Sequence, residues 1–206
     1  MKKITCLLLL LTAFQVNAQE FRYAARAGLN LADKTNTSGT FKPGLNFGVS
    51  AEYLVTPVFS AEAGIYYSMQ GSKFKFANTD LVHNYINIPL LAKYYVHRGL
   101  NIFAGPQLGI KATVNKQAFG IKNKELEAGR VEGDMVKPFD LSAVIGVGYL
   151  LENGFFVSAN INAGLTNTAK NQFTYYDKSA GKVISHSTDK ESFKNIVIQF
   201  NFGYRF

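Results

Sequence analysis

The chain is dominated by segments in which apolar and polar residues alternate one by one. The clearest segment is the last, where every even position from 196 onward is apolar and the odd positions from 199 onward are polar or glycine. Its apolar members are Ile196, Ile198, Phe200, Phe202, Tyr204 and Phe206. Because successive side chains of a strand point to opposite faces, the segment predicts a β-strand with one apolar and one polar face.

Seven earlier segments repeat this alternation. They cover residues 22–31, 44–54, 59–70, 85–96, 101–112, 139–149 and 155–165. Short turns near Pro57, Gly99 and Asn153 alternate with long polar loops at 32–43, 71–84, 113–138 and 166–192. Each segment has the length that a tilted strand needs to cross a bilayer. The pattern predicts an all-β fold, an eight-stranded antiparallel up-and-down transmembrane β-barrel.

The composition of the apolar face predicts that it contacts lipid. In all eight segments this face lacks charged, amide and hydroxyl side chains other than Tyr, whereas a soluble ligand-binding barrel would turn its apolar residues inward. Aromatic residues on this face gather next to the short turns, as in the girdle at a membrane interface. They are Tyr23, Tyr53, Phe59, Tyr94, Tyr149, Phe155, Tyr204 and Phe206.

Charged residues on the polar face would point into the barrel. Arg26, Glu52, Glu62, Lys93 and Arg205 lie in the half near the short turns, and Lys111 and Asp140 lie near the long loops. Charges in a narrow lumen must be paired. We therefore predict an ion network that fills the barrel, with a proton or solute path as the alternative.

Two prolines interrupt the strand pattern. Pro89 and Pro106 fall inside the fourth and fifth segments. Because proline has no backbone N–H to donate, each predicts a bulge or a local gap in the strand pairing.

The N-terminus has the features of a secretory signal. Lys2 and Lys3 precede an apolar run, and Val16-Asn17-Ala18 is a small-residue cleavage site. We expect residues 1–18 to be a signal peptide cleaved near Ala18 and residues 19–206 to be the barrel domain. Cys6 falls in the signal, so the mature chain would have no thiol. The net charge of +8 does not predict nucleic-acid binding, because an exported barrel would not encounter nucleic acid.

Catalytic and metal-binding motifs are weak. His83, His97 and His186 lack ligand spacing, and no Gly-x-Ser-x-Gly or phosphate-binding glycine loop occurs. We expect no cofactor, no metal and no enzyme activity; the enzymatic alternative would rest on His83 with Asp80. The charges of the loop at 113–138 predict a solvated surface, or alternatively a partner site. They include Lys122, Lys124, Glu125, Glu127 and Arg130.

Several short motifs resemble the PorT-type outer-membrane β-barrel family of Bacteroidetes. They are Asn17-Ala18-Gln19, the segments at 27–30, 85–94, 103–109 and 163–167, and the terminal aromatic residue. The resemblance covers the whole mature chain, and Ile88-Pro89-Leu90 and Gly105-Pro106 are its most specific parts. It implies an eight-stranded outer-membrane barrel without catalytic residues; the namesake of the family is linked to protein secretion and gliding. The last strand also resembles the signal read by the barrel assembly machinery, carried here by Phe200, Phe202, Tyr204 and Phe206.

The leading hypothesis is a non-enzymatic, integral outer-membrane barrel that is structural or interacts through its extracellular loops. One alternative is an accessory component of a secretion or gliding machinery, and another is a narrow small-solute porin. The expected partners are outer-membrane lipid, the barrel assembly machinery during insertion and secretion-system proteins. No nucleic-acid partner is expected.

Overall fold

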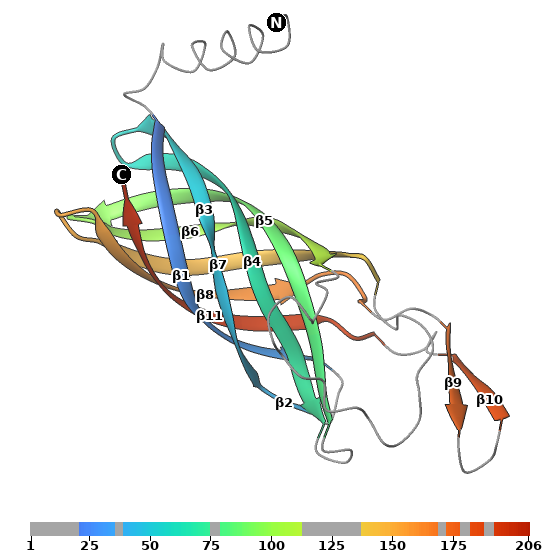
Figure 1. Cartoon of the computed structure of the whole chain (residues 1–206). Coiled ribbons are helices and arrows are strands. Elements are labelled where there is room, and N and C mark those ends of the chain that lie inside the picture. Colours follow the sequence, from blue (N-terminus) through green and yellow to red (C-terminus); the bar gives the residue numbers. More distant parts are fainter. Residues whose placement is uncertain are drawn as a thin grey trace, which may run out of the picture.

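A closed barrel of eight antiparallel strands forms the body of the molecule in the computed structural model (Figure 1). The structure describes residues 21–35, 39–74, 79–112, 137–168, 172–177, 182–187 and 192–206. The barrel strands are β1 (Phe21–Lys34), β3 (Lys42–Thr56), β4 (Phe59–Phe74), β5 (Thr79–His97), β6 (Leu100–Ala112), β7 (Phe139–Leu150), β8 (Phe155–Gly164) and β11 (Asn195–Arg205). Consecutive barrel strands pair, and β11 pairs with β1 to close the ring. The predicted fold class is confirmed.

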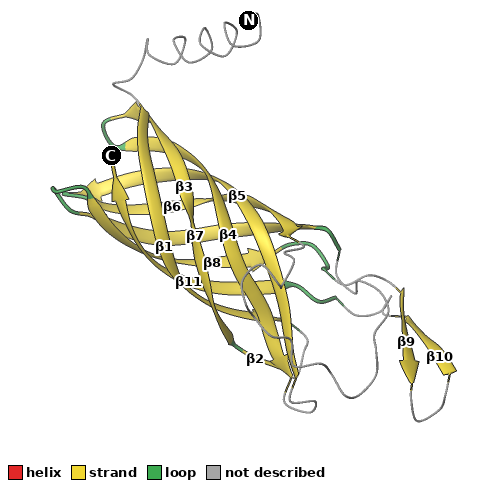
Figure 2. Ribbon diagram, viewed as in Figure 1, coloured by secondary structure: helices red, strands yellow, loops and turns green. Residues whose placement is uncertain are grey.

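The two ends of the barrel differ in their connections (Figure 2). The three short turns, the start of β1 and the end of β11 lie at one end, which we call the turn end. The longer connections leave the opposite end, the loop end. At the turn end β5 and β6 are joined by Arg98 and Gly99, which have φ angles of 38° and 87°. Two successive positive φ angles are typical of a type I′ hairpin turn.

The apolar face of each strand points away from the barrel axis, as predicted. Ile145 in the middle of β7 is 65% exposed, and Val49, Ile65 and Phe200 are exposed in other strands. The predicted aromatic girdle is present at the turn end. Within it, ring centroids lie 5.0 Å apart for both Phe21–Tyr53 and Phe155–Tyr204. The barrel therefore presents a continuous apolar band to its surroundings. No helix in the described part of the chain is long and apolar enough to cross a membrane.

Both in-strand prolines produce a local gap in the strand pairing. Between β5 and β6 the pairing stops at Pro89↔Gln107 and resumes at Ala92↔Ala104 in the same register. Between β4 and β5 it is likewise interrupted opposite Pro89. Because the register is unchanged on either side, the irregularity is a gap rather than a bulge.

The predicted strand ends at the loop side are wrong for β4 and β5. Residues 71–74 and 79–84, expected to be loop, continue the two strands and pair with each other from Gly71↔Val82 to Phe74↔Thr79. A strand needs alternating apolar residues only where one of its faces contacts lipid. The alternation in β4 and β5 therefore ends before their backbone pairing ends. A short strand, β2 (Gly39–Thr40), adds to the end of β4.

The predicted loop at 166–192 also contains secondary structure. Strands β9 (Gln172–Asp177) and β10 (Lys182–Ser187) pair antiparallel as a separate two-stranded sheet. Figure 1 shows this hairpin beyond the loop end of the barrel. The alternation signal did not find it because neither strand faces the bilayer.

A charge placed on the outer face tests the orientation of the barrel. We expect Ile145→Lys to lower the free energy of unfolding in lipid vesicles by about 2–4 kcal/mol, because it places an ammonium group near the middle of the hydrocarbon. Ile145→Ala should cost less, and Asn153→Lys in a short turn should cost under about 0.5 kcal/mol. The measurement is denaturant unfolding of the refolded protein. An equal cost for Lys and Ala at position 145 would contradict a lipid-facing β7.

Candidate functional site: the barrel interior

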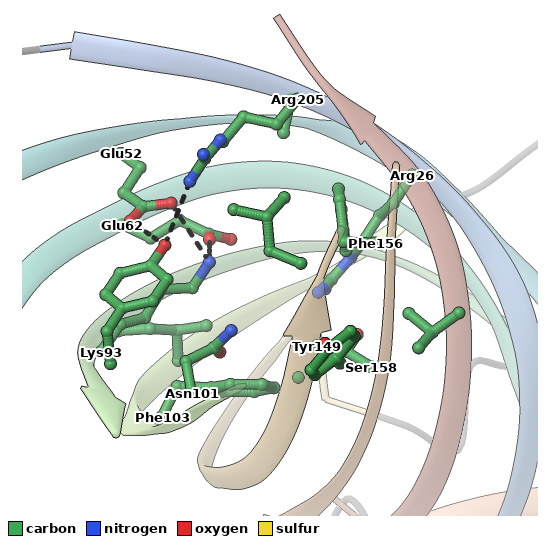
Figure 3. Close-up of a pocket in the computed structure, with 16 residues that line it drawn as sticks. Arg26, Glu52, Glu62, Lys93, Asn101, Phe103, Tyr149, Phe156, Ser158 and Arg205 are labelled. Carbon is green, nitrogen blue, oxygen red and sulfur yellow. Dashed lines mark hydrogen bonds and ion pairs between the residues drawn. The ribbon is translucent and has the colours of Figure 1, made fainter. Parts of the chain in front are cut away.

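Two glutamates face each other in the lumen at the turn end. Glu52 of β3 and Glu62 of β4 are directly opposite in the strand pairing, an arrangement that is destabilising for like charges. Lys93 of β5 lies between them (Figure 3): its Nζ is 3.4 Å from Glu52 Oε2 and forms an ion pair with Glu62 Oε2. A single lysine therefore bridges both carboxylates.

Hydroxyl groups satisfy the remaining carboxylate oxygens. The Ser60 hydroxyl donates to Glu52 Oε1 at 2.7 Å, and the Tyr95 hydroxyl donates to the same oxygen. The Tyr66 hydroxyl donates to Glu62 Oε1 at 3.3 Å. Charge-assisted hydrogen bonds of this kind are stronger than neutral ones. Both carboxylates are thus held by partners from β4 and β5.

Two arginines join this cluster through tyrosines rather than through carboxylates. The Arg26 guanidinium lies 3.8 Å above the centre of the Tyr66 ring, a cation–π contact. Arg205 Nη1 donates to Tyr95 Oη at 3.5 Å. Among the predicted network residues of the turn end, only Glu52, Glu62 and Lys93 form direct ion pairs with one another. Tyr66 and Tyr95 occupy the polar face of their strands, but the alternation pattern did not indicate their contacts with the arginines.

The interior beside this cluster is narrow. A cavity of about 30 Å³ remains between the charged cluster and the β6–β8 wall, enough for about one water molecule. Beyond it Leu91, Phe103 and Val144 pack together, each at most 5% exposed. Gly146 makes room for this packing, since a Cβ there would lie 2.5 Å from the Phe103 ring. The lumen of β5–β7 is therefore partly apolar, whereas the sequence predicted a polar interior.

A belt of amide side chains crosses the lumen on the opposite wall. The amide belt consists of Asn30, Asn46, Asn160, Asn162, Gln199 and Asn201, all buried. Asn30 Oδ1 accepts from Asn46 and from Gln199, each at 2.8 Å. Asn160 in turn donates to Gln199 Oε1 at 2.9 Å and accepts from Asn201 at 3.0 Å. The belt links β3, β1, β11 and β8 by side chains as well as by backbone.

A third cluster closes the loop end of the lumen. Both oxygens of Asp140 are hydrogen-bonded: Thr166 donates to Oδ1 at 2.9 Å and Asn195 to Oδ2 at 2.8 Å. Lys34 lies within electrostatic range of Asp140 and Lys111 and donates to Thr168 at 3.4 Å. The predicted network is thus divided between two ends of the barrel. Lys34 was missed, although it continues the even-numbered polar face of β1.

The aromatic residues of the last strand all lie on the outer face. Phe200, Phe202 and Tyr204 are exposed, and the Phe202 and Tyr204 rings lie 5.4 and 5.0 Å from the Phe155 ring. Phe206 is 75% exposed and contacts Tyr204 at 5.2 Å between centroids. Its backbone N–H donates to Tyr23 O at 2.8 Å, next to the closing β1–β11 seam. The strand proposed as an assembly signal is therefore accessible from the membrane side.

The described side chains do not form a metal site. Within them, no group of three or more His, Cys, Asp or Glu residues could hold an ion. His97 is exposed at the turn end. The side chains of Asp80, His83 and His186, and the charged residues of the loop at 122–130, lie outside the described set. The enzymatic alternative based on His83 and Asp80 therefore has no described geometry.

Comparison with known proteins gives the family. A family model described as "Outer membrane protein beta-barrel domain" matches residues 17–170. The chain belongs to this family. The protein is thus an outer-membrane β-barrel, and its short-turn end is the periplasmic end in barrels of this kind. No curated protein sequence matches the chain.

Three solved outer-membrane proteins are similar to the chain at low sequence identity. Neisserial surface protein A is 13% identical, with 90% of this chain and 97% of that chain covered and a TM-score of 0.47. OprG from Pseudomonas aeruginosa is 14% identical, with 90% and 94% covered and a TM-score of 0.44. Outer membrane protein W of E. coli is 16% identical, with 91% and 98% covered and a TM-score of 0.39.

Removing Lys93 tests the turn-end cluster of this outer-membrane barrel. We expect Lys93→Met to lower the free energy of unfolding by about 3 kcal/mol, because two opposed and buried carboxylates lose their shared cation. The double variant Glu62→Gln/Lys93→Met should recover much of this loss, since one carboxylate remains with its hydroxyl partners. Unfolding in lipid vesicles measures both, and Lys137→Met at the loop end serves as the control. If the double variant is no more stable than Lys93→Met, Lys93 does not act as a bridge between the two glutamates.

Proposed function

We propose that this protein is a non-enzymatic outer-membrane barrel that acts through its loop end rather than through its lumen. The observation that supports this is the filling of the interior. The turn-end cluster, the apolar contact of Leu91 with Phe103, the amide belt and the Asp140 cluster follow one another along the lumen. A small-solute path would need an open passage through all of them, so the porin alternative is not part of the proposal.

The loop end carries the features suited to partner binding. Strands β4 and β5 extend past the predicted bilayer span, and the β9–β10 hairpin lies outside the barrel. The stems of the last loop are anchored: Thr168 Oγ1 donates to Phe193 O at 2.9 Å, and Lys194 N donates to Thr35 Oγ1 at 3.0 Å. A loop held by a rigid scaffold is a common location for binding sites.

An accessory role in protein secretion is the more specific form of this proposal. It rests on the resemblance to PorT-type barrels, above all on Ile88-Pro89-Leu90 and Gly105-Pro106, and a gap in the strand pairing accompanies both prolines. The assignment to Bacteroidetes, the signal peptide at 1–18 and recognition of Phe206 by the assembly machinery remain predictions.

A conductance measurement tests the closed lumen. Purified protein added to a planar bilayer should give no discrete current steps, because charged and apolar side chains occupy the interior. An open porin in the same bilayer provides the positive control. Reproducible steps whose size rises with salt concentration would contradict the closed interior and restore the porin alternative.

Replacing the loops tests the site of action. We expect replacement of residues 171–190 by a short Gly-Ser linker to leave the barrel folded, because the anchoring contacts of Thr168, Phe193 and Lys194 are retained. The readouts are the heat-dependent gel shift of the folded barrel and cross-linking in cells, with cross-linked proteins identified by mass spectrometry.

The matched variant replaces residues 113–136 instead. A secretion-system component that is cross-linked to the wild type and lost in one loop variant would support the accessory role. If all cross-linked partners persist after both replacements, the loops are not the site of action.

A further inference from the structure

The turn end of the barrel opens into a pocket with a strongly basic lining. The mouth pocket has a volume of about 320 Å³. Its lining residues include Arg22, Val58, His97, Arg98, Leu150 and Arg205. These residues come from β1, β5, β7, β11 and two of the short turns, so the pocket spans the mouth of the barrel. Three of them are arginines, and none is Asp or Glu.

Arg22 lacks the partner that the strand pairing would give it. It lies directly opposite Glu52 in the β1–β3 pair, which would normally favour an ion pair. The Glu52 carboxylate instead contacts Ser60, Tyr95 and Lys93. Among the described residues, neither Arg22 nor Arg98 has a carboxylate oxygen within 4.0 Å.

The layer beneath the pocket does not neutralise it. In that layer the two glutamates form ion pairs with Lys93, and Glu52 also lies within electrostatic range of Arg205. Arg205 and Tyr95 line both this layer and the mouth pocket. Glu152 lies in the β7–β8 turn at the same end, but it is exposed and does not line the pocket. Arg22 and Arg98 therefore leave a net positive charge at the pocket.

Arg98 occupies a backbone position that disfavours it. Its φ of 38° lies in the left-handed region, where Asn, Asp or Gly is usual in a type I′ turn. Arginine at this position therefore does not serve the turn itself. Arg98 is exposed and is one of the residues that line the mouth pocket.

We propose that the mouth pocket binds a phosphate group at the periplasmic face of the outer membrane. Guanidinium groups bind phosphate in a planar, bidentate manner. The aromatic girdle places the pocket at the level of the lipid headgroups. The phosphate could be carried by a headgroup or by a free molecule. This site lies at the opposite end from the loops and is independent of their role.

The test uses two variants that are both expected to weaken phosphate binding. Arg98→Asn places a favoured residue in the turn, so it should preserve or raise stability while weakening phosphate binding. Arg22→Gln removes a second lining charge and provides the same test if the turn variant does not fold. Lys137→Gln removes one positive charge at the loop end and is the matched control.

The first measurement is calorimetric titration of inorganic phosphate into the full chain in nanodiscs of phosphatidylcholine. We expect binding to the wild type and to Lys137→Gln, and affinity at least roughly tenfold lower for Arg98→Asn and Arg22→Gln. The second is retention of phosphatidylglycerol in nanodiscs without free phosphate, detected by native mass spectrometry. If Arg98→Asn and Arg22→Gln also lose bound phosphatidylglycerol, the site binds a lipid headgroup. If they lose affinity only for inorganic phosphate, the site binds a free phosphate compound.

Three results would overturn the proposal. One is absence of binding in both assays. Another is a loss of phosphate affinity in Lys137→Gln as large as the loss in the two pocket variants. That result would mean that binding depends on the overall charge of the protein rather than on the pocket. The third is tighter binding of a poly-glutamate peptide than of either phosphate ligand, lost in the same two variants, which would make the mouth a docking site for an acidic protein segment.

Discussion

Backbone hydrogen bonding in a medium without water is the constraint on which this structure depends. In hydrocarbon an unpaired strand edge is too costly, so the sheet must close on itself. The β1–β11 seam provides this closure with eleven paired positions, from Ala24↔Arg205 to Lys34↔Asn195. Closure with eight strands fixes a narrow lumen. The lumen must then be filled, and every polar group inside it needs a partner from another strand.

The interior is filled in different ways along its length. At the turn end, the Glu52 and Glu62 carboxylates share Lys93. On one wall neutral amides hydrogen-bond to one another, and on the other apolar side chains such as Phe103 fill the space. At the loop end Asp140 accepts hydrogen bonds from Thr166 and Asn195, with Lys34 in electrostatic range. Because side chains occupy the lumen along its length, the barrel acts as a support. Sites that bind partners or ligands are therefore expected at its two ends.

The two ends have different characters. The loop end projects paired strands beyond the bilayer span and anchors a further hairpin through Thr168 and Lys194. The turn end is compact, with aromatic rings outside and arginines around the mouth. Most of the charge balance inside the barrel is local, and Arg22 and Arg98 have no described carboxylate partner in it. A barrel whose lumen is filled with side chains can thus still offer distinct surfaces at its two ends.

The sequence alone determined the eight barrel strands, their order and which face meets lipid, because alternation with a period of two is a local property of the chain. It also indicated the inward charges and the gaps at Pro89 and Pro106. It did not find β2, β9 and β10 or the full length of β4 and β5. Only the tertiary structure decided that Lys93 serves two glutamates, that Tyr66 and Tyr95 connect the arginines, and that Arg22 is left without its cross-strand partner. The reason is geometric: closing the barrel brings side chains from different strands together around the axis, and their contacts depend on side-chain directions that alternation does not encode.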